Sequence, residues 1–181
     1  MNESGLIVRQ ARPEELAELG RLVAEAYVGL PGMPGEAEQP GYYASLRDAA
    51  RRVQNHAINV FAAVGAAGGL VGSVDFIDDM KHYGSGGAAS TVVGAAGVRL
   101  LAVKAAHRGG GAGKALTRFC IARAEALGRA RLILHTTRAM ATAWGMYERL
   151  GFERFVELDF KQGALEVFGF QLRLPLAGRA R

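Results

Sequence analysis

The sequence is poor in the features that mark secreted, membrane-bound and disulfide-stabilised proteins. It has one cysteine in 181 residues, so no internal disulfide can form. No apolar run approaches the roughly 18 residues needed to cross a bilayer. The N-terminus lacks the basic and apolar regions of a signal peptide. We therefore expect a cytoplasmic protein without membrane contact, in which Cys120 is a small core residue rather than a nucleophile.

Clustered charge and metal-ligand spacing are also missing. The net charge is +5, but the cations are scattered, with only Arg51 and Arg52 adjacent and a loose pair at Arg179 and Arg181. This distribution disfavours a nucleic-acid-binding face, although a basic balance would help to attract a polyanionic cofactor. The four histidines, at positions 56, 82, 107 and 135, show no spacing typical of a metal site, so no metal is expected.

What the sequence does contain is enough apolar residues for one packed domain over residues 1–181, since half of the chain is hydrophobic. The pattern predicts a mixed α/β sheet with helices on its faces. Strands are expected at Leu6–Arg9, Ile58–Val64, Leu70–Ile77, Thr91–Val103, Arg131–His135, Phe152–Phe160 and Glu166–Leu174. Helices are expected at Pro13–Tyr27, Tyr42–Gln54, Lys114–Leu127 and Ala139–Leu150, with irregular loops at 29–41 and 78–90.

The most informative stretch is residues 98–116, where an apolar strand runs through a loop with four glycines into a helix. The first amides of a helix have no intrahelical acceptor and lie at the positive end of the helix dipole. Glycine lets the backbone approach an anion closely. Arg108 and Lys114 would add full charges. A phosphate or pyrophosphate is the expected ligand, against the alternative of a flexible surface loop.

Two common phosphate loops do not fit this stretch. A P-loop requires Gly-Lys followed by Ser or Thr, but Lys114 is followed by Ala115. A dinucleotide fingerprint requires Gly-x-Gly-x-x-Gly, and its last position is Lys114 when the count starts at Gly109. Arg-x-x-Gly-x-Gly does fit, at Arg108, Gly111 and Gly113.

Two motifs together identify a family resemblance. The first is Leu101-Ala-Val103 followed by this Arg-x-x-Gly-x-Gly, and the second is Tyr147-x-x-Leu-Gly-Phe152 at a helix end. The pair, with one strand between, resembles the GNAT superfamily of acyl-CoA-dependent N-acetyltransferases, although the second motif alone could be a plain helix end. The order of elements is similar too. The resemblance implies a mixed, mostly antiparallel seven-stranded sheet flanked by about four helices.

The resemblance also implies a function, the direct transfer of an acetyl group from acetyl-CoA to the amine of a small molecule or peptide. Tyr147 matches the family's general acid, against the alternative that it only packs. Backbone N–H groups near Leu101, Ala102 and Val103 would polarise the thioester carbonyl. The pyrophosphate would be held by the amides of Arg108, Gly109, Gly110, Gly111, Ala112, Gly113 and Lys114.

The sequence departs from the family pattern at two places. Many relatives carry a glutamate where this chain has Gly97, so the general base is open between Asp75, His135 and a water chain. Asp75 could instead face solvent, and His135 could instead bond a neighbouring loop. The second departure is Met140, which replaces an asparagine that contacts the pantetheine arm. Thr136 or Thr137 could supply that contact.

The acceptor is less well defined than the donor. The loops 29–41 and 78–90 and the helix after Gly41 are expected to build its pocket, with Tyr42, Tyr43, Asp79 and His82 as candidate substrate contacts. The missing acid at Gly97 keeps a second possibility open, a non-catalytic acyl-CoA-binding sensor on the same fold. The terminal strands could pair in a homodimer.

Overall fold

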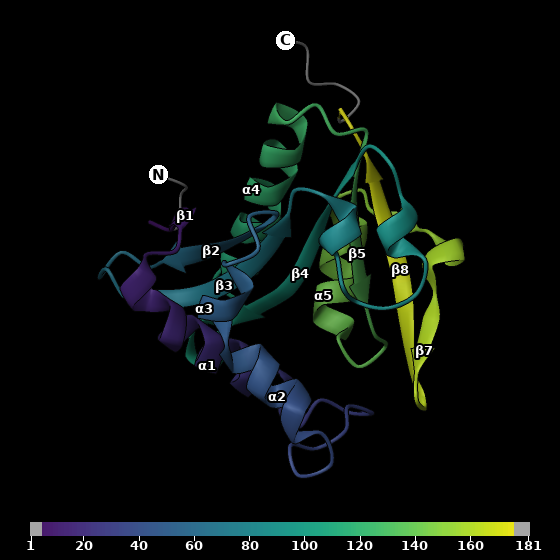
Figure 1. Cartoon of the computed structure of the whole chain (residues 1–181). Coiled ribbons are helices and arrows are strands. Elements are labelled where there is room, and N and C mark those ends of the chain that lie inside the picture. Colours follow the sequence, from purple (N-terminus) through teal and green to yellow (C-terminus); the bar gives the residue numbers. More distant parts are fainter. Residues whose placement is uncertain (1–4, 176–181) are drawn as a thin grey trace.

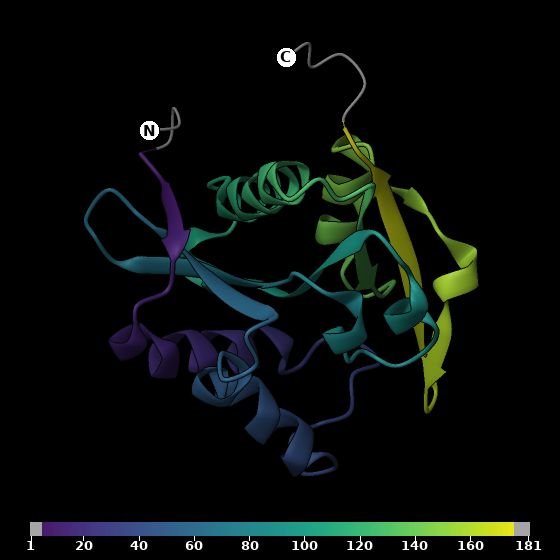
Figure 2. The ribbon, with the colours of Figure 1, turned by 45° about the horizontal axis from the view of Figure 1, so that its top comes forward.

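The computed structural model describes residues 5–175 and shows one open sheet covered by helices on both faces. The sheet order is β1-β2-β3-β4-β5-β8-β6, with β7 paired to β8. Figure 2 shows α4 above the sheet and α1 and α2 below it. The strands are β1 (Ile7–Gln10), β2 (Ile58–Val64), β3 (Leu70–Ile77), β4 (Ala95–Val103), β5 (Arg131–Thr136), β6 (Glu153–Arg154), β7 (Phe160–Gln162) and β8 (Leu165–Arg173).

Five α-helices and five short 3-10 turns accompany these strands in the described part of the chain (Figure 1). The α-helices are α1 (Leu16–Tyr27), α2 (Pro40–Arg47), α3 (Ala49–Arg52), α4 (Ala112–Ala126) and α5 (Ala141–Arg149). The 3-10 turns are η1 (Pro13–Glu15), η2 (Met80–His82), η3 (Ala89–Thr91), η4 (Ala105–His107) and η5 (Val156–Leu158). The expected mixed and mostly antiparallel sheet is confirmed, with eight strands rather than seven.

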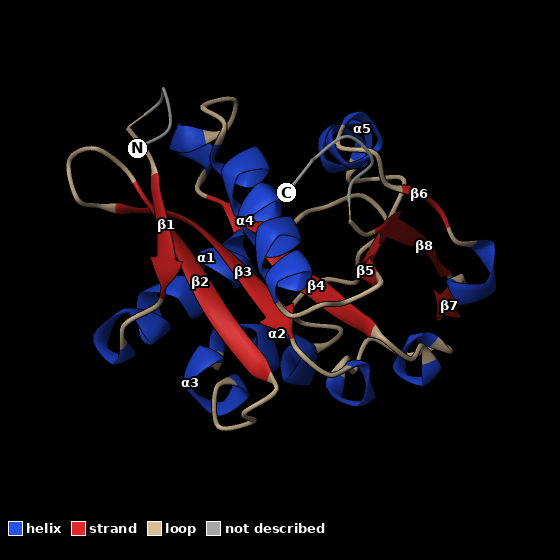
Figure 3. Ribbon diagram, turned by 90° about the horizontal axis from the view of Figure 1, so that it is seen from above, coloured by secondary structure: helices blue, strands red, loops and turns tan. Residues whose placement is uncertain are grey.

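Every adjacent strand pair is antiparallel except β4 and β5, which run parallel. The parallel ladder is short: it begins at Ala95 opposite Arg131 and ends at Val98 opposite Leu134. Beyond this point β4 continues to Val103 alongside β3, while β5 continues to Thr136 alongside β8. Two neighbouring strands of one sheet therefore separate in the middle of the molecule (Figure 3).

A bulge in β4 follows directly after the point of separation. Asp75 pairs with Arg99 and Ser73 pairs with Ala102, so Val74 alone faces two residues of β4. One of those two, Leu100, has φ 52°, in the left-handed region that costs a non-glycine residue about 1–2 kcal/mol. As a result Val98, Arg99 and Leu100 all border one pocket, instead of alternating between the two faces.

The core lies on both faces of the sheet because both carry apolar side chains. The larger cluster packs α4 and the Tyr147 end of α5 against the strands, and it includes Leu116, Cys120 and Phe170. The opposite face is covered by α1, α2 and α3. Cys120 is fully buried, in agreement with its expected place on the apolar side of the helix.

Three expected elements are wrong in their extent. The helix expected over 42–54 is split at Asp48, whose side chain accepts a hydrogen bond from the amide of Arg51 and so starts α3 as a new helix. The strand expected from Thr91 begins only at Ala95, because residues 89–91 form η3 and Gly94 turns with φ 70°.

The third correction concerns the strand expected over 152–160. Glu153 and Arg154 pair with β8, η5 then interrupts the strand, and pairing with β8 resumes only at Phe160, where β7 begins. Gly169 on β8 explains the interruption: its amide donates to the Asp159 carboxylate and its carbonyl accepts from the amide of Phe155, so the segment crosses over β8 at this glycine. Apolar side chains continue through the segment, but its backbone does not remain extended.

Candidate active site

The loop between β4 and α4 presents a set of backbone amides without acceptors. Within the described residues, the amides of Gly109, Gly111, Ala112, Gly113 and Lys114 donate to no backbone or side-chain group. Gly109 has φ 80° and Gly111, the N-cap of α4, has φ 84°, which only glycine adopts without strain. Arg108 and Lys114 are exposed beside the loop. This arrangement suits an oxyanion, as the sequence pattern predicts.

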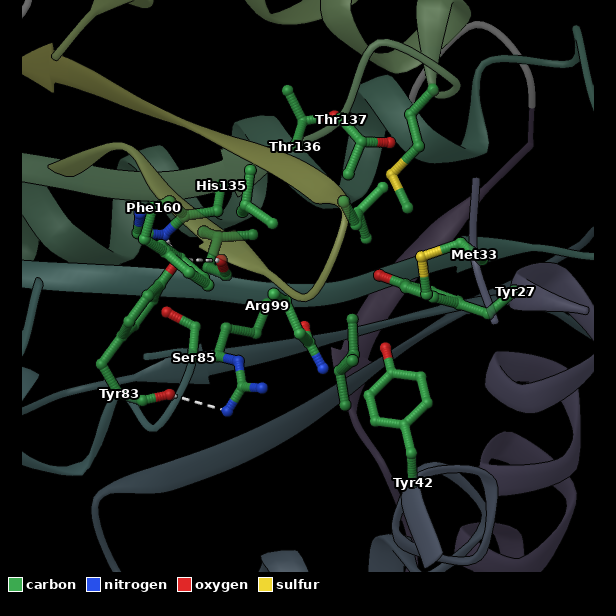
Figure 4. Close-up of a pocket in the computed structure, with 16 residues that line it drawn as sticks. Tyr27, Met33, Tyr42, Tyr83, Ser85, Arg99, His135, Thr136, Thr137 and Phe160 are labelled. Atoms are coloured by element: carbon green, nitrogen blue, oxygen red, sulfur yellow. Dashed lines mark hydrogen bonds between the residues drawn. The ribbon is translucent and has the colours of Figure 1, made fainter. Parts of the chain in front are cut away.

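A pocket lies where β4 and β5 separate. It is lined by β4 (Val98, Arg99, Leu100), by the end of β5 and the turn after it (His135, Thr136, Thr137, Met140), by the α1–α2 region (Tyr27, Met33, Tyr42), by Tyr83 and Ser85, and by the β7–β8 hairpin (Phe160, Gln162, Leu165, Val167). Figure 4 shows these side chains converging from segments far apart in the sequence. The pocket brings together only part of the predicted substrate set.

Two threonines present hydroxyl groups to this pocket. Thr136 and Thr137 are 2% and 4% exposed, and their Oγ1 atoms have no hydrogen-bond partner among the described residues. A buried hydroxyl without a partner costs free energy, so such groups are normally satisfied by a ligand or by water. Both residues thus stand where a polar chain entering between β4 and β5 would pass.

The place of the missing acid is filled by Tyr83. A Cβ atom built on Gly97 would lie 2.4 Å from Cδ2 of Tyr83 and 3.1 Å from the sulfur of Met80. Tyr83 is itself 1% exposed. The space that a glutamate would need at position 97 is therefore occupied by an aromatic ring from the 78–90 loop.

His135 is engaged at both ring nitrogens. Its Nε2 lies 2.9 Å from the carbonyl oxygen of Leu158, which can only accept, so Nε2 is assigned the proton. Its Nδ1 lies 3.0 Å from the hydroxyl of Tyr83, and that hydroxyl also lies 3.3 Å from the carbonyl oxygen of Val98, so its single proton is shared between two acceptors. Burial lowers the pKa of His135, which favours the neutral ring. The histidine thus bonds a neighbouring segment, one of the two roles considered for it, and an incoming amine would have to displace the Tyr83 hydroxyl to reach Nδ1.

Asp75 is buried but lies outside the pocket lining. It is 2% exposed, and its Oδ2 accepts from Nε of Arg52 at 2.7 Å. Nη1 of Arg52 also donates to the carbonyls of Ser45 and Leu46 at the end of α2. Burial raises the pKa of Asp75, and the charge of Arg52 opposes that rise. The carboxylate thereby joins β3 to the helices below the sheet.

Tyr147 is a core residue on α5. It is 5% exposed, its ring packs against Phe152 with centroids 5.7 Å apart, and it belongs to the α4-side cluster. Burial raises the pKa of its hydroxyl, so the phenol stays protonated across the physiological range. It is not part of the pocket lining.

The four candidate substrate residues do not lie together in the structure. Tyr42 lines the pocket, whereas its neighbour Tyr43 is fully buried and donates to the carbonyl of Pro34 at 3.0 Å. Asp79 is exposed and accepts from the amide of Lys81, which starts η2. His82 is exposed and bonds Asn55 at 3.0 Å. Tyr42 alone of the four therefore borders the pocket.

Sequence reasoning missed Arg99, Tyr27 and Phe160, which all line the pocket. Arg99 could have been identified as a candidate from the sequence, because it is a single cation inside an otherwise apolar strand. No metal-ligand cluster of three His, Cys, Asp or Glu side chains occurs among residues 5–175. In the same described range, no helix is both long and apolar enough to pass through a membrane.

Comparisons with known proteins agree with this geometry. A family model described as the acetyltransferase (GNAT) family matches residues 21–152. A GNAT-family acetyltransferase from Staphylococcus aureus has a similar structure, with 14% identity, a TM-score of 0.70, and coverage of 94% of this chain and 99% of that one. A search of curated proteins finds no match.

Two further structures are similar and carry ligands. The yncA protein of Salmonella typhimurium, solved with its cofactor acetyl-CoA, is 18% identical with a TM-score of 0.67, and the match covers 96% of each chain. A spermidine N-acetyltransferase from Vibrio cholerae, solved with CoA and spermine, is 18% identical with a TM-score of 0.62 over 94% of this chain and 96% of that one. The family match extends over most of the sequence and the fold agrees with it, so the chain belongs to the GNAT family of acetyltransferases.

Proposed function

We propose that the protein transfers the acetyl group of acetyl-CoA to a primary amine of a small molecule or peptide by direct attack within a ternary complex. In this reaction the amine nitrogen forms a bond to the thioester carbonyl carbon and the carbon–sulfur bond breaks. The nitrogen loses one proton, and the departing thiolate gains one. The products are an acetamide and free CoA.

The observation that carries the proposal is the separation of β5 from β4, the strand that leads into the amide-rich loop. The parallel ladder stops at Val98 and Leu134, and the free amides of Gly109 and residues 111–114 follow β4. Acetyl-CoA is a long molecule that carries a pyrophosphate and, at its far end, a thioester. Its binding therefore requires both an anion-binding loop and a gap between strands. The unpartnered hydroxyls of Thr136 and Thr137 add polar contacts within the gap.

The proton transfers are assigned to different groups. Tyr147, with a hydroxyl kept protonated by burial, is the proposed donor to the thiolate. The amine proton has no carboxylate acceptor among the lining residues, because Gly97 replaces the usual acid and Asp75 pairs with Arg52 outside the lining. We propose that water in the pocket takes this proton and that the Tyr83–His135 pair is the nearest protein acceptor, in preference to Asp75.

One observation favours a second candidate function. The Tyr83 ring fills the position of the missing acid, and both nitrogens of His135 are engaged. A protein that binds acetyl-CoA as a sensor needs the loop and the gap between strands but no base. This candidate shares the donor site with the first and differs from it only in turnover.

The deciding experiment measures thiol release from acetyl-CoA with a panel of amines, amino acids and peptides. Calorimetry measures CoA binding to the same preparation. The proposed function predicts release with at least one acceptor and an acetylated product of the expected mass. Binding of CoA without release across the panel would reject the enzyme and support the sensor. Absence of CoA binding would reject both.

A further inference from the structure

The pocket is lined by one positively charged side chain and by no carboxylate. Arg99 is the only Asp, Glu, Lys or Arg among the lining residues that the structure describes. Its Nη1 donates to the backbone carbonyl of Tyr83 at 2.7 Å, and it forms no ion pair with any described residue. A guanidinium has five N–H donors, so most of its donors are left for a ligand.

The acidic side chains around the pocket are already paired. Asp75 faces Arg99 across β3 and β4, but its 2.7 Å ion pair is with Arg52. Two guanidinium groups therefore share one carboxylate, and a single positive charge is in excess. On the β7–β8 side, Asp159 pairs with Arg154, and Glu166 lies 4.0 Å from Lys161.

Two tyrosines direct unpartnered hydroxyls to the same space. Tyr27 at the end of α1 and Tyr42 on α2 point into the pocket, and neither phenol bonds another described residue (Figure 4). Burial raises the pKa of both phenols, and the nearby positive charge of Arg99 opposes the rise. Both hydroxyls are therefore protonated donors facing the same cation.

The remaining lining is apolar or aromatic. Met33, Leu165 and Val167 border the pocket, and Phe160 packs edge-on against His135 with centroids 5.3 Å apart. A surplus cation with two phenol donors in such surroundings suits a planar monoanion attached to an apolar body, because Arg binds carboxylates through paired hydrogen bonds. The same pocket disfavours a second ammonium group, which Arg99 would repel.

We propose that the acceptor amine carries a carboxylate bound by Arg99 with the hydroxyls of Tyr27 and Tyr42, so that the substrate class is amino acids rather than polyamines. This inference rests on the proposed acetyltransferase function and specifies its substrate. Arg99 lies on β4 next to Val98, the last residue paired with β5. A substrate held there would have its carboxylate at the entrance to the gap where the thioester is expected.

The first test needs no variant. Acetylation rates are compared for apolar α-amino acids, for the same amino acids as C-terminal amides, and for spermidine. We expect kcat/KM for the free acids to exceed that for the amides by about 100-fold. A neutral amide cannot form the paired, charged hydrogen bonds that a carboxylate forms with Arg99, so the guanidinium would lose them. Rates on the amides or on spermidine that equal or exceed those on the acids would overturn the inference while leaving the acetyltransferase function intact.

The second test uses Arg99→Gln and Arg99→Lys, with Arg51→Gln as the matched control. Arg51 is an exposed arginine of α3 outside the pocket. Arg99→Gln should lower kcat/KM for the acids about 100-fold, with little change for the amides, and Arg99→Lys should retain part of the preference. An equal loss on acids and amides would reduce Arg99 to a packing role and overturn the inference. No turnover of any amine by the wild-type protein would overturn the acetyltransferase function, and this inference with it.

Discussion

Tyr83 and Gly97 form a close pair in which an aromatic ring lies directly on a glycine of β4. The pair joins the 78–90 loop to the sheet at the position where the family resemblance leads us to expect an acid. It explains why the loop backbone can place the carbonyl of Tyr83 within 2.7 Å of Arg99. The glycine is thus required by the packing of Tyr83 in this chain.

Gly97→Ala should therefore destabilise the protein, by about 1–3 kcal/mol in the free energy of unfolding, because the new methyl group would overlap the Tyr83 ring. Urea denaturation measures the change. Gly41→Ala is the matched control, since no atom lies within 4 Å of its added Cβ and its φ is ordinary. A neutral Gly97→Ala would show that the ring can move aside.

The loop glycines allow a second prediction about the donor site. Gly111→Ala forces an alanine to φ 84° at the start of α4, which costs about 1–2 kcal/mol or displaces the free amides. We expect stability to fall by that amount and CoA affinity to fall about tenfold, both followed by calorimetry.

Gly163→Ala provides the comparison for this variant. Gly163 has φ 62° at the β7–β8 turn, and its added Cβ would meet no atom within 4 Å, as at Gly111. It should show the same loss of stability with unchanged CoA affinity. Equal CoA affinity in both variants would mean that the amides after β4 do not hold the pyrophosphate.

Tyr147→Phe tests the proposed proton donor. We expect kcat to fall about 100-fold with CoA affinity unchanged, because only the hydroxyl is removed from a packed ring. Burial raises the pKa of this phenol, so the wild-type rate should not fall through ionisation of Tyr147 below about pH 10. Stopped-flow thiol release between pH 6 and 9 measures both effects.

Trp144→Phe on the same helix is the control for that variant. It removes the 2.7 Å hydrogen bond from the indole to Glu148 and should leave turnover unchanged. An unchanged kcat in Tyr147→Phe would assign the tyrosine to packing alone.

A pH-dependent contribution to stability is expected from Glu15. The hydrogen bonds from Arg9, at 2.6 and 2.8 Å, together with the amide of Arg12, lower the pKa of Glu15 to about 2. Because the folded pKa lies below the unfolded value, the stabilisation is present above about pH 4.5 and is lost as pH falls from 4.5 towards 2.

Glu15→Gln should cost about 1 kcal/mol at pH 7, since the pair is partly exposed, and close to nothing near pH 2. Urea denaturation at the two pH values measures the difference. Glu14→Gln is the control, because Glu14 forms no ion pair within the described residues. A cost that persists at pH 2 would assign the effect to packing rather than charge.

The parts of the fold that were predictable from sequence depend on local physics. Helical periodicity, glycines at positive φ and the motif around Arg108 are properties of short segments, so they located α4, its loop and most strands. The break at Asp48 also has a local cause, because Asp is a common N-cap residue at the start of a helix. The apolar stripe continues on both sides of Asp48, and for this reason the sequence pattern predicted one helix instead of two.

The acceptor side was less predictable because it is made by contacts between distant segments. Tyr83 and Gly97 are 14 positions apart and meet only after the 78–90 loop folds back over β4. The ion pair between Asp75 and Arg52, which are 23 positions apart, likewise forms only in the folded chain. The segment 152–160 keeps an apolar pattern, yet its crossing at Gly169 is a tertiary contact that periodicity does not encode.

The guanidinium of Arg52 ties the last turn of α2 to Asp75 on β3, and Tyr42 lies in the first turn of the same helix. The donor loop after β4 has no part in this connection. The Tyr42 side of the pocket is therefore anchored through β3, and substitutions in α2 or in the β7–β8 hairpin leave the sequence of the loop after β4 unchanged. Selection on a chain built in this way can change which amine is acetylated and leave the affinity for the acetyl donor as it was.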